Sequence, residues 1–186
     1  MNLINVGVSA PEFSLIDHNK RETSLSSYRG SKNVVLSFHV YTFTDGWRDQ
    51  ILSFMANSSQ FERRDTQVLG ISTDARPTQT AYYMCLGPTV HYPIPLLSDF
   101  EPKGRVSRLY GVYDENTGTA KRSVIVIDKG GFVVFSRLYT STIEAGITGQ
   151  AFVESDLDVN NILEELDHLK NTVWANPSAT TWLIFQ

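Results

Sequence analysis

The order of strand-like and helix-like segments predicts an α/β domain with a mixed central sheet and helices on both faces. Residues 33–40 form a nearly continuous apolar run with β-branched side chains, which is typical of a parallel strand covered on both faces. Amphipathic segments follow this run and the next strand, and strand–helix–strand units give parallel strands. A glycine-containing hairpin near residue 130 adds antiparallel strands to the same sheet.

The N-terminal residues are predicted to form a small hairpin, from residues 10–15 and 21–25, ahead of the apolar strand. A helix follows that strand, and Thr44 or Asp45 can supply the side-chain oxygen that caps it. One face of this helix is apolar at helical spacing, which predicts that it is buried. The residues on that face are Trp47, Ile51, Phe54 or Met55, Ser58 and Phe61.

The second half of the chain continues the alternation of strands and helices. We expect a strand at 67–73, a helix at 78–86, an extended segment at 93–99, a short helix at 104–110, a hairpin at 123–139 and a last helix. Gly130 and Gly131 tolerate the positive φ that a tight turn needs. Ser155 and Asp158 resemble a capping box, so the last helix is expected to begin near Ser155.

Length and composition are those of one soluble globular domain. The 186 residues are 41% hydrophobic and 19% charged, which predicts a domain at residues 1–170 and an apolar C-terminal extension at 171–186. The net charge of −4 argues against nucleic acid or an anionic membrane as the main partner. No apolar stretch approaches the length of a membrane span, and the first residues lack the pattern of a secretory signal. We therefore expect a cytoplasmic protein.

The cysteine and histidine content limits the chemistry that this chain can perform. Cys85 is the one cysteine, so the chain can form no internal disulfide and no two-cysteine redox cycle. Its apolar neighbours are typical of an inert thiol that packs as a small hydrophobic residue. The four histidines are scattered, so no structural zinc site is expected. No cofactor is expected either. His39, within the central strand, is expected to be a core residue.

Six short segments occur in a characteristic order along the chain. They are residues 10–15 (APEFSL), 24–30 (SLSSYRG), 43–50 (FTDGWRDQ), 69–74 (LGISTD), 95–99 (PLLSD) and 122–128 (RSVIVID). In this order and spacing they resemble the alkyl hydroperoxide reductase/thiol-specific antioxidant (AhpC/TSA) family, the peroxiredoxins. The resemblance covers about residues 6–170 and implies a thioredoxin-like fold of the peroxiredoxin branch, an antioxidant lineage and a homodimer.

The family's reaction, as the resemblance implies it, needs a cysteine thiolate that attacks the O–O bond of a peroxide and becomes a sulfenic acid. Thr44 and Arg122 match the threonine and the arginine of the family's catalytic site, but Trp47 stands at the position of the cysteine. Indole has no ionisable thiol, so standard peroxide reduction is expected to be absent. Three neighbours stand where the motif has proline, threonine and glutamate: Asp45, Arg48 and Gln50.

Two interpretations of Trp47 stay open. Trp47 is a core aromatic that fills the former pocket, or it marks a redox position that was recoded or substituted. The second interpretation arises because the tryptophan codon differs by one base from the cysteine codons and from the codon reused for selenocysteine. Thr44 is either a simple helix cap or a vestigial ligand, and Arg122 is either a strand-end ion-pair partner or a residue that points toward the old site.

Three functions are compatible with these residues. The first is a peroxiredoxin-like protein whose peroxide chemistry was lost or altered at residue 47, and the second is a non-enzymatic binding, assembly or regulatory protein on the same fold. A thiol enzyme that uses Cys85 is the least favoured. A peroxide-like small molecule or a protein is the expected partner. The apolar residues 182–185 are expected to dock on this chain or on a partner.

Overall fold

The computed structural model describes residues 2–87, 94–139 and 157–175, and its main feature is a mixed β-sheet. Within these residues the sheet has seven strands in the order β2-β1-β5-β4-β3-β8-β9. The pairs β3–β4 and β4–β5 are parallel, whereas all other neighbours are antiparallel. The strands are β1 (Ser14–Asp17), β2 (Glu22–Ser24), β3 (Asn33–Phe38), β4 (Thr66–Ser72), β5 (Leu96–Ser98), β8 (Ser123–Ile127) and β9 (Val133–Leu138).

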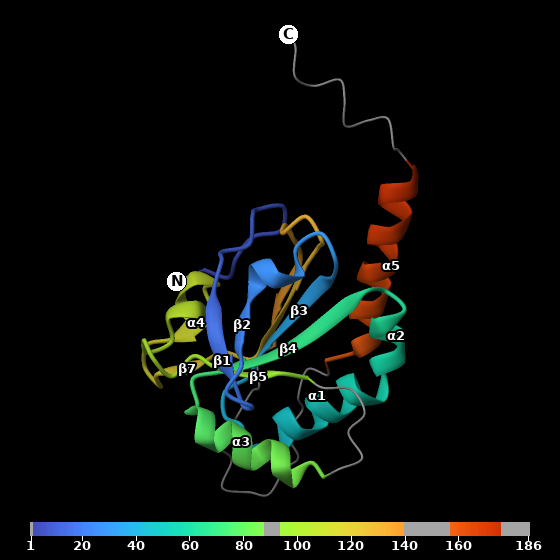
Figure 1. Cartoon of the computed structure of the whole chain (residues 1–186). Coiled ribbons are helices and arrows are strands. Elements are labelled where there is room, and N and C mark those ends of the chain that lie inside the picture. Colours follow the sequence, from blue (N-terminus) through green and yellow to red (C-terminus); the bar gives the residue numbers. More distant parts are fainter. Residues whose placement is uncertain (1, 88–93, 140–156, 176–186) are drawn as a thin grey trace, which may run out of the picture.

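Helices cover both faces of this sheet, as the sequence predicts (Figure 1). In the view of Figure 1, α1, α2 and α5 lie on one side of the sheet, α4 lies on the other, and α3 lies at its lower end. The remaining elements are the 3₁₀ helix η1 (Leu25–Tyr28), α1 (Asp45–Ala56), α2 (Ser58–Glu62), α3 (Arg76–Cys85), α4 (Arg105–Leu109), the hairpin β6 (Tyr113–Asp114) and β7 (Thr119–Ala120), and α5 (Val159–Ala175). The β6–β7 hairpin is too short to be recognised in the sequence.

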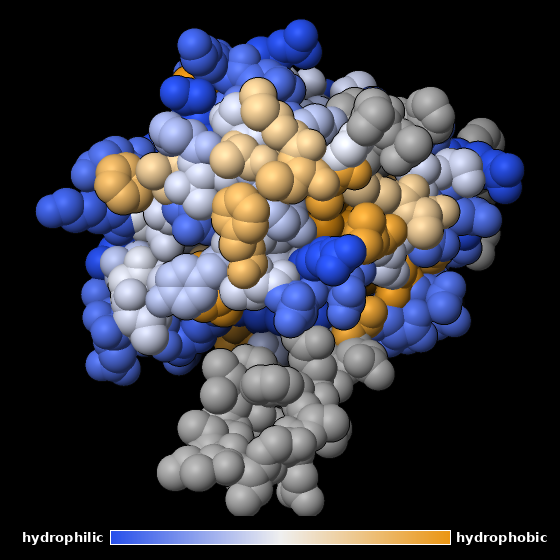
Figure 2. Space-filling model, turned by 90° about the horizontal axis from the view of Figure 1, so that it is seen from below, coloured by the Kyte–Doolittle hydropathy of each residue, from blue (hydrophilic) through white to orange (hydrophobic). Residues whose placement is uncertain are grey.

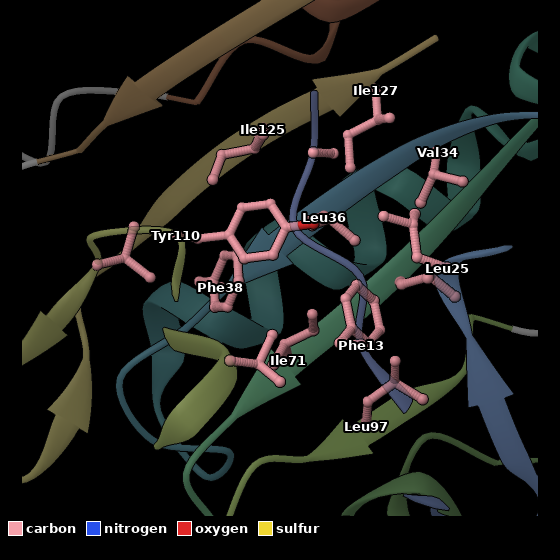
Figure 3. Close-up of a cluster of buried hydrophobic side chains, with 14 of the residues drawn as sticks. Phe13, Leu25, Val34, Leu36, Phe38, Ile71, Leu97, Tyr110, Ile125 and Ile127 are labelled. Carbon is pink, nitrogen blue, oxygen red and sulfur yellow. The ribbon is translucent and has the colours of Figure 1, made fainter. Parts of the chain in front are cut away.

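Alternate residues of the central strand enter two separate cores. Leu36 and Phe38 of β3 contribute to the core on the α4 side, where Tyr110 packs over the sheet (Figure 3). Val35 contributes to the other core, which lies beneath α1, α2 and α5. All six residues of β3 are buried. This two-sided burial explains why the strand is an unbroken apolar run in the sequence.

The helix that the sequence predicts from Thr44 to Phe61 is in fact two helices. α1 ends before Asn57, whose φ of −99° and ψ of 13° depart from helical geometry. The Asn57 side-chain Nδ2 donates to the Ser53 carbonyl at 2.9 Å. The Asn57 N–H donates to the same carbonyl at 3.2 Å, so the break lies in the backbone angles of Asn57 and not in a lost hydrogen bond at this residue. Phe61 is nevertheless buried in the same core as Trp47, Ile51 and Phe54, as its spacing predicts.

The last helix begins later than expected. α5 starts at Val159, and Asp158 caps it by accepting a hydrogen bond at 2.9 Å from the Asn160 N–H. An Asp side chain that bonds to the second residue of a helix satisfies a donor that has no partner within the helix. Ser155, the predicted cap, lies outside the described residues. The extension predicted at 171–186 lies outside them from residue 176 onward.

Candidate functional site

Trp47 lies in the first turn of α1, and its side chain is buried. It is 2% exposed and belongs to the core beneath α1, α2 and α5, together with Ile51 and Phe54. The indole stacks on the His39 imidazole, with ring centroids 3.7 Å apart and planes inclined by 5°. His39 follows β3 and is itself 2% exposed. The structure therefore buries both rings, Trp47 as the apolar face of the helix predicts and His39 as its place in the sequence next to β3 predicts.

The far edge of the indole reaches β4, the strand next to β3, at Gly70. A Cβ atom at Gly70 would lie 2.9 Å from Cη2 of Trp47 and 2.9 Å from Cδ2 of Leu96. Such distances are too short for carbon atoms that are not bonded to each other. The indole therefore occupies the space that a side chain at position 70 would need. Gly70 belongs to the segment at 69–74 that resembles the family motif, in which this position is also a glycine. The indole at residue 47 therefore fits without a substitution at residue 70.

The stacked pair has two polar atoms without partners. Within the described part of the chain, Trp47 Nε1 and His39 Nδ1 are buried and make no hydrogen bond. An unsatisfied buried polar group costs about 1–3 kcal/mol. The other ring nitrogen of His39, Nε2, lies 3.4 Å from Thr42 Oγ1. The packing of the two rings must therefore offset the free-energy cost of burying these two nitrogen atoms without hydrogen bonds.

A carboxylate fixes the segment that leads into α1. Asp74, after β4, accepts hydrogen bonds through Oδ2 from the Thr42 N–H at 2.8 Å and from Thr42 Oγ1 at 2.6 Å. Ser72 Oγ donates to the same oxygen at 2.9 Å. Hydrogen bonds to a carboxylate are stronger than those between neutral groups. Residues 39–44 are thereby held against the end of β4, and the His39 imidazole is held beneath Trp47.

Acid should destabilise the protein through His39. Burial lowers the pKa of His39 from 6.5 to about 3, against the opposing effect of the Asp74 carboxylate. The unfolded chain therefore binds a proton between pH 6.5 and 3 that the folded chain does not bind, so stability is lost as the pH falls through this range. The loss approaches about 1.4 kcal/mol per pH unit. The free energy of unfolding is measured by denaturant titration of the wild type and of His39→Phe between pH 7 and 4. If the free energy depends on pH as steeply in the variant as in the wild type, the proton binds to a group other than His39.

Arg122 reaches α1 through a buried glutamine. Arg122 Nε donates to Gln50 Oε1 at 2.8 Å, and Gln50 Nε2 donates to Ser37 Oγ at 2.5 Å. Gln50 is 2% exposed and lies one helical turn after Trp47. The guanidinium is therefore linked to the turn of the helix that carries Trp47. The sequence shows Gln50 as a departure from the family motif, and its spacing of three from Trp47 places it on the same side of the helix.

Thr44 occupies the cap position of α1 but does not cap it with its side chain. Its hydroxyl donates instead to the Tyr41 carbonyl at 2.9 Å. Asp45 is the first residue of the helix rather than its cap. The predicted side-chain cap from Thr44 or Asp45 is therefore wrong. The Thr44 hydroxyl stabilises the turn at residues 41–44, and the side chain is exposed.

Comparison with known proteins decides the family. The sequence profile described as the AhpC/TSA family matches residues 6–136. The chain belongs to this family. Alkyl hydroperoxide reductase E of Mycobacterium tuberculosis is 37% identical over 136 residues, which are 73% of this chain and 86% of that protein. Peroxiredoxin-2 of Bos taurus is 37% identical over 136 residues, which cover 68% of this chain and 65% of the relative.

Solved structures of peroxiredoxins share the fold. Peroxidoxin BcpB from Mycobacterium tuberculosis superposes with a TM-score of 0.71 at 23% identity and covers 88% of this chain and 97% of its own. AhpC from the same organism superposes with a TM-score of 0.72 at 23% identity and covers 98% of this chain and 100% of its own. The predicted thioredoxin-like fold of the peroxiredoxin branch is confirmed.

The thiol of this peroxiredoxin lies away from the core. Cys85 is exposed, which corrects the expectation that it packs as a small hydrophobic residue. It is the last residue of α3, beyond Gln79 and Tyr82, through which the helix is buried. Within the described residues no group of three or more His, Cys, Asp and Glu side chains could hold a metal ion. No helix there is long and apolar enough to span a bilayer.

Proposed function

We propose that this peroxiredoxin does not reduce peroxides and that it serves as a binding, assembly or regulatory protein of antioxidant lineage. The observation that carries the proposal is the position of Trp47. The resemblance of the segment at 43–50 to the family motif puts this residue at the position of the family's cysteine, and the indole is 2% exposed and stacked on His39. An indole cannot form a sulfenic acid, so the first step of the family's reaction has no nucleophile at this position.

The test is peroxide consumption by the wild-type protein with a supplied thiol reductant. We expect the rate to equal that of reductant and peroxide alone, and we expect Cys85→Ser to leave it unchanged. Alkyl hydroperoxide reductase E of Mycobacterium tuberculosis provides the comparison protein. Consumption that persists in the Cys85→Ser variant would overturn the proposal. Consumption that disappears in this variant would instead support a thiol enzyme that uses Cys85.

A second candidate is a redox protein whose chemistry changed at residue 47 alone. The hydrogen bond from Arg122 to Gln50 favours it, because an arginine of the family motif still reaches α1. Asp45 and Arg48 oppose it, because they depart from the motif beside residue 47. The codon at position 47 bears on the same question, since UGG would rule out recoding. Proposed partners are a second copy of this chain or another protein, and the cytoplasmic location stays a prediction.

A further inference from the structure

Three segments of the chain meet at the buried imidazole of His18. His18 follows β1, in the turn that leads to β2, and is 3% exposed. Its ring stacks on the Tyr83 ring of α3, with centroids 3.9 Å apart and planes inclined by 24°. The Thr80 hydroxyl, also on α3, donates to the His18 carbonyl at 2.7 Å. The third segment begins at Leu96, the first residue of β5. We call His18, Thr80, Tyr83 and Leu96 the His18 junction.

The Leu96 backbone is bonded to His18 in both directions. The His18 N–H donates to the Leu96 carbonyl at 2.9 Å, and the Leu96 N–H donates to Nδ1 of the ring at 3.1 Å. The side-chain amide of Asn19 lies 2.9 Å from the other ring nitrogen, Nε2. A neutral imidazole carries one proton, and because Nδ1 accepts a hydrogen bond, this proton is on Nε2. The junction therefore requires the neutral form of the ring.

A second proton on the ring removes the acceptor that Leu96 uses. Both nitrogens of an imidazolium are donors, so the Leu96 N–H would face an N–H at Nδ1. Leu96 is 0% exposed, and a buried donor without an acceptor is unfavourable. Water can satisfy both N–H groups once the junction is open. Protonation of His18 therefore favours separation of the three segments.

The charged groups around the ring act in opposite directions. Asp17 favours the protonated form of His18, and Arg21 opposes it. The Asp17 carboxylate also accepts two backbone hydrogen bonds within the β1–β2 turn, at 2.7 and 2.8 Å. Of the described residues, α3 meets the ring with Tyr83, and β5 meets it with its backbone. Burial has the largest effect, and it lowers the pKa of His18 from its usual 6.5.

We propose that the His18 junction is an acid-sensitive switch, in which protonation of His18 separates α3 and the start of β5 from the β1–β2 turn while the central strands stay folded. The open junction binds a proton more readily than the closed junction does, so closure weakens as the pH falls below about 6.5. The inference goes beyond the proposed function and holds whether or not the chain reduces peroxides.

The switch acts at the end of the molecule that α3 occupies. α3 lies at the lower end in Figure 1, and Figure 2, which views this end, shows apolar side chains beside polar ones at the surface. His18 is covered there by Tyr83 of α3. Separation of α3 from the turn changes this surface without unfolding the protein, which gives a regulatory protein a means to respond to acid.

Hydrogen–deuterium exchange at single amides, followed by NMR at pH 7 and pH 5, tests the switch. The protection factor of the Leu96 N–H, which corrects for the intrinsic effect of pH on exchange, should fall about tenfold in the wild type. His18→Asn should abolish this fall, because asparagine Oδ1 can accept from Leu96 but does not titrate in this range. His39→Phe is the matched control at a second buried histidine, and the fall should persist in it.

Three results of this experiment would overturn the proposal. They are a wild-type protection factor that does not fall, an equal fall in His18→Asn, and a fall that disappears in His39→Phe. At pH 5 the Leu36 N–H of β3 should stay better protected than the Leu96 N–H, because the central strands remain folded. Equal protection of the two amides would mean that the whole protein unfolds, and it would contradict a local switch.

An NMR titration of the wild type gives a second measurement, which needs no variant. The Cε1–H signal of His18 should titrate with a pKa below 6.5, and the Leu96 amide signal should move with the same midpoint. A His18 pKa at or above 6.5, or a Leu96 signal that does not follow His18, would contradict the switch. Neither result affects the proposed absence of peroxide reduction, which the consumption assay tests separately.

Discussion

Replacing Trp47 by alanine is expected to lower the free energy of unfolding by about 3–5 kcal/mol. The side chain is 2% exposed, and its removal leaves a cavity between α1 and β4 and also ends the stacking on His39. Large-to-small substitutions in a core lose both the transfer free energy and the contacts of the cavity walls. Urea denaturation followed by circular dichroism measures the loss. A change below 1 kcal/mol would show that the indole is not packed as the structure indicates.

The contact between Trp47 and Gly70 predicts that substitutions at these two residues affect stability in a coupled way. Gly70→Ala should cost about 1–3 kcal/mol in the wild type, because the new methyl group meets Trp47 and Leu96 at 2.9 Å. The same substitution should cost at least about 1 kcal/mol less in the Trp47→Ala background, where one of the two clashes is absent. Leu52→Ala is the control for the cycle, because Leu52 is 42% exposed on the same helix. The stability losses of Leu52→Ala and Gly70→Ala should add in the double variant. If the losses of Trp47→Ala and Gly70→Ala also add, the contact between Trp47 and residue 70 is contradicted.

The central strand and the family segments were the most predictable parts of the fold. Residues 33–38 are buried on both faces, and their composition alone indicates a strand covered on both sides. It does not show that this strand is parallel to β4 but antiparallel to β8. The hairpin β8–β9 was equally clear, and Gly131 has the positive φ of 88° that its turn requires. These features depend on residues that are close to each other in the sequence, so they can be recognised from the sequence alone.

The parts that the sequence did not reveal depend on contacts between distant segments. The hydrogen bond from Arg122 to Gln50 joins residues 72 positions apart, and the Thr42–Asp74 bonds join residues 32 apart. The break at Asn57 lies in the backbone angles of one residue, and apolar spacing continues across it. Cys85 is flanked by apolar residues in the sequence, yet it lies past the packed part of α3. Spacing shows which face of a helix is apolar but not where packing on that face stops.

Introducing a thiol at residue 47 is expected to give a site that reacts with peroxide at least ten times faster than Cys85 does in the wild type. The variant is Trp47→Cys in a Cys85→Ser background, so that each protein carries a single thiol. The N-terminal turn of α1 and the nearby Arg122 both favour a thiolate at position 47. Cys85 is an exposed thiol at the end of α3 and provides the reference rate in the same fold.

The rate is measured by trapping the sulfenic acid with dimedone and following its mass as the hydrogen peroxide concentration is varied. Trp47→Ser in the same background controls for the cavity left by the indole, and its folded state is checked by circular dichroism. Adding Arg122→Met should remove most of the gain, because the guanidinium no longer stabilises the thiolate. If residue 47 reacts no faster than Cys85, then the changes at Asp45, Arg48 and Gln50 have also disabled the site. A rate that rises and depends on Arg122 would instead support the second candidate, a redox protein whose chemistry changed at residue 47 alone.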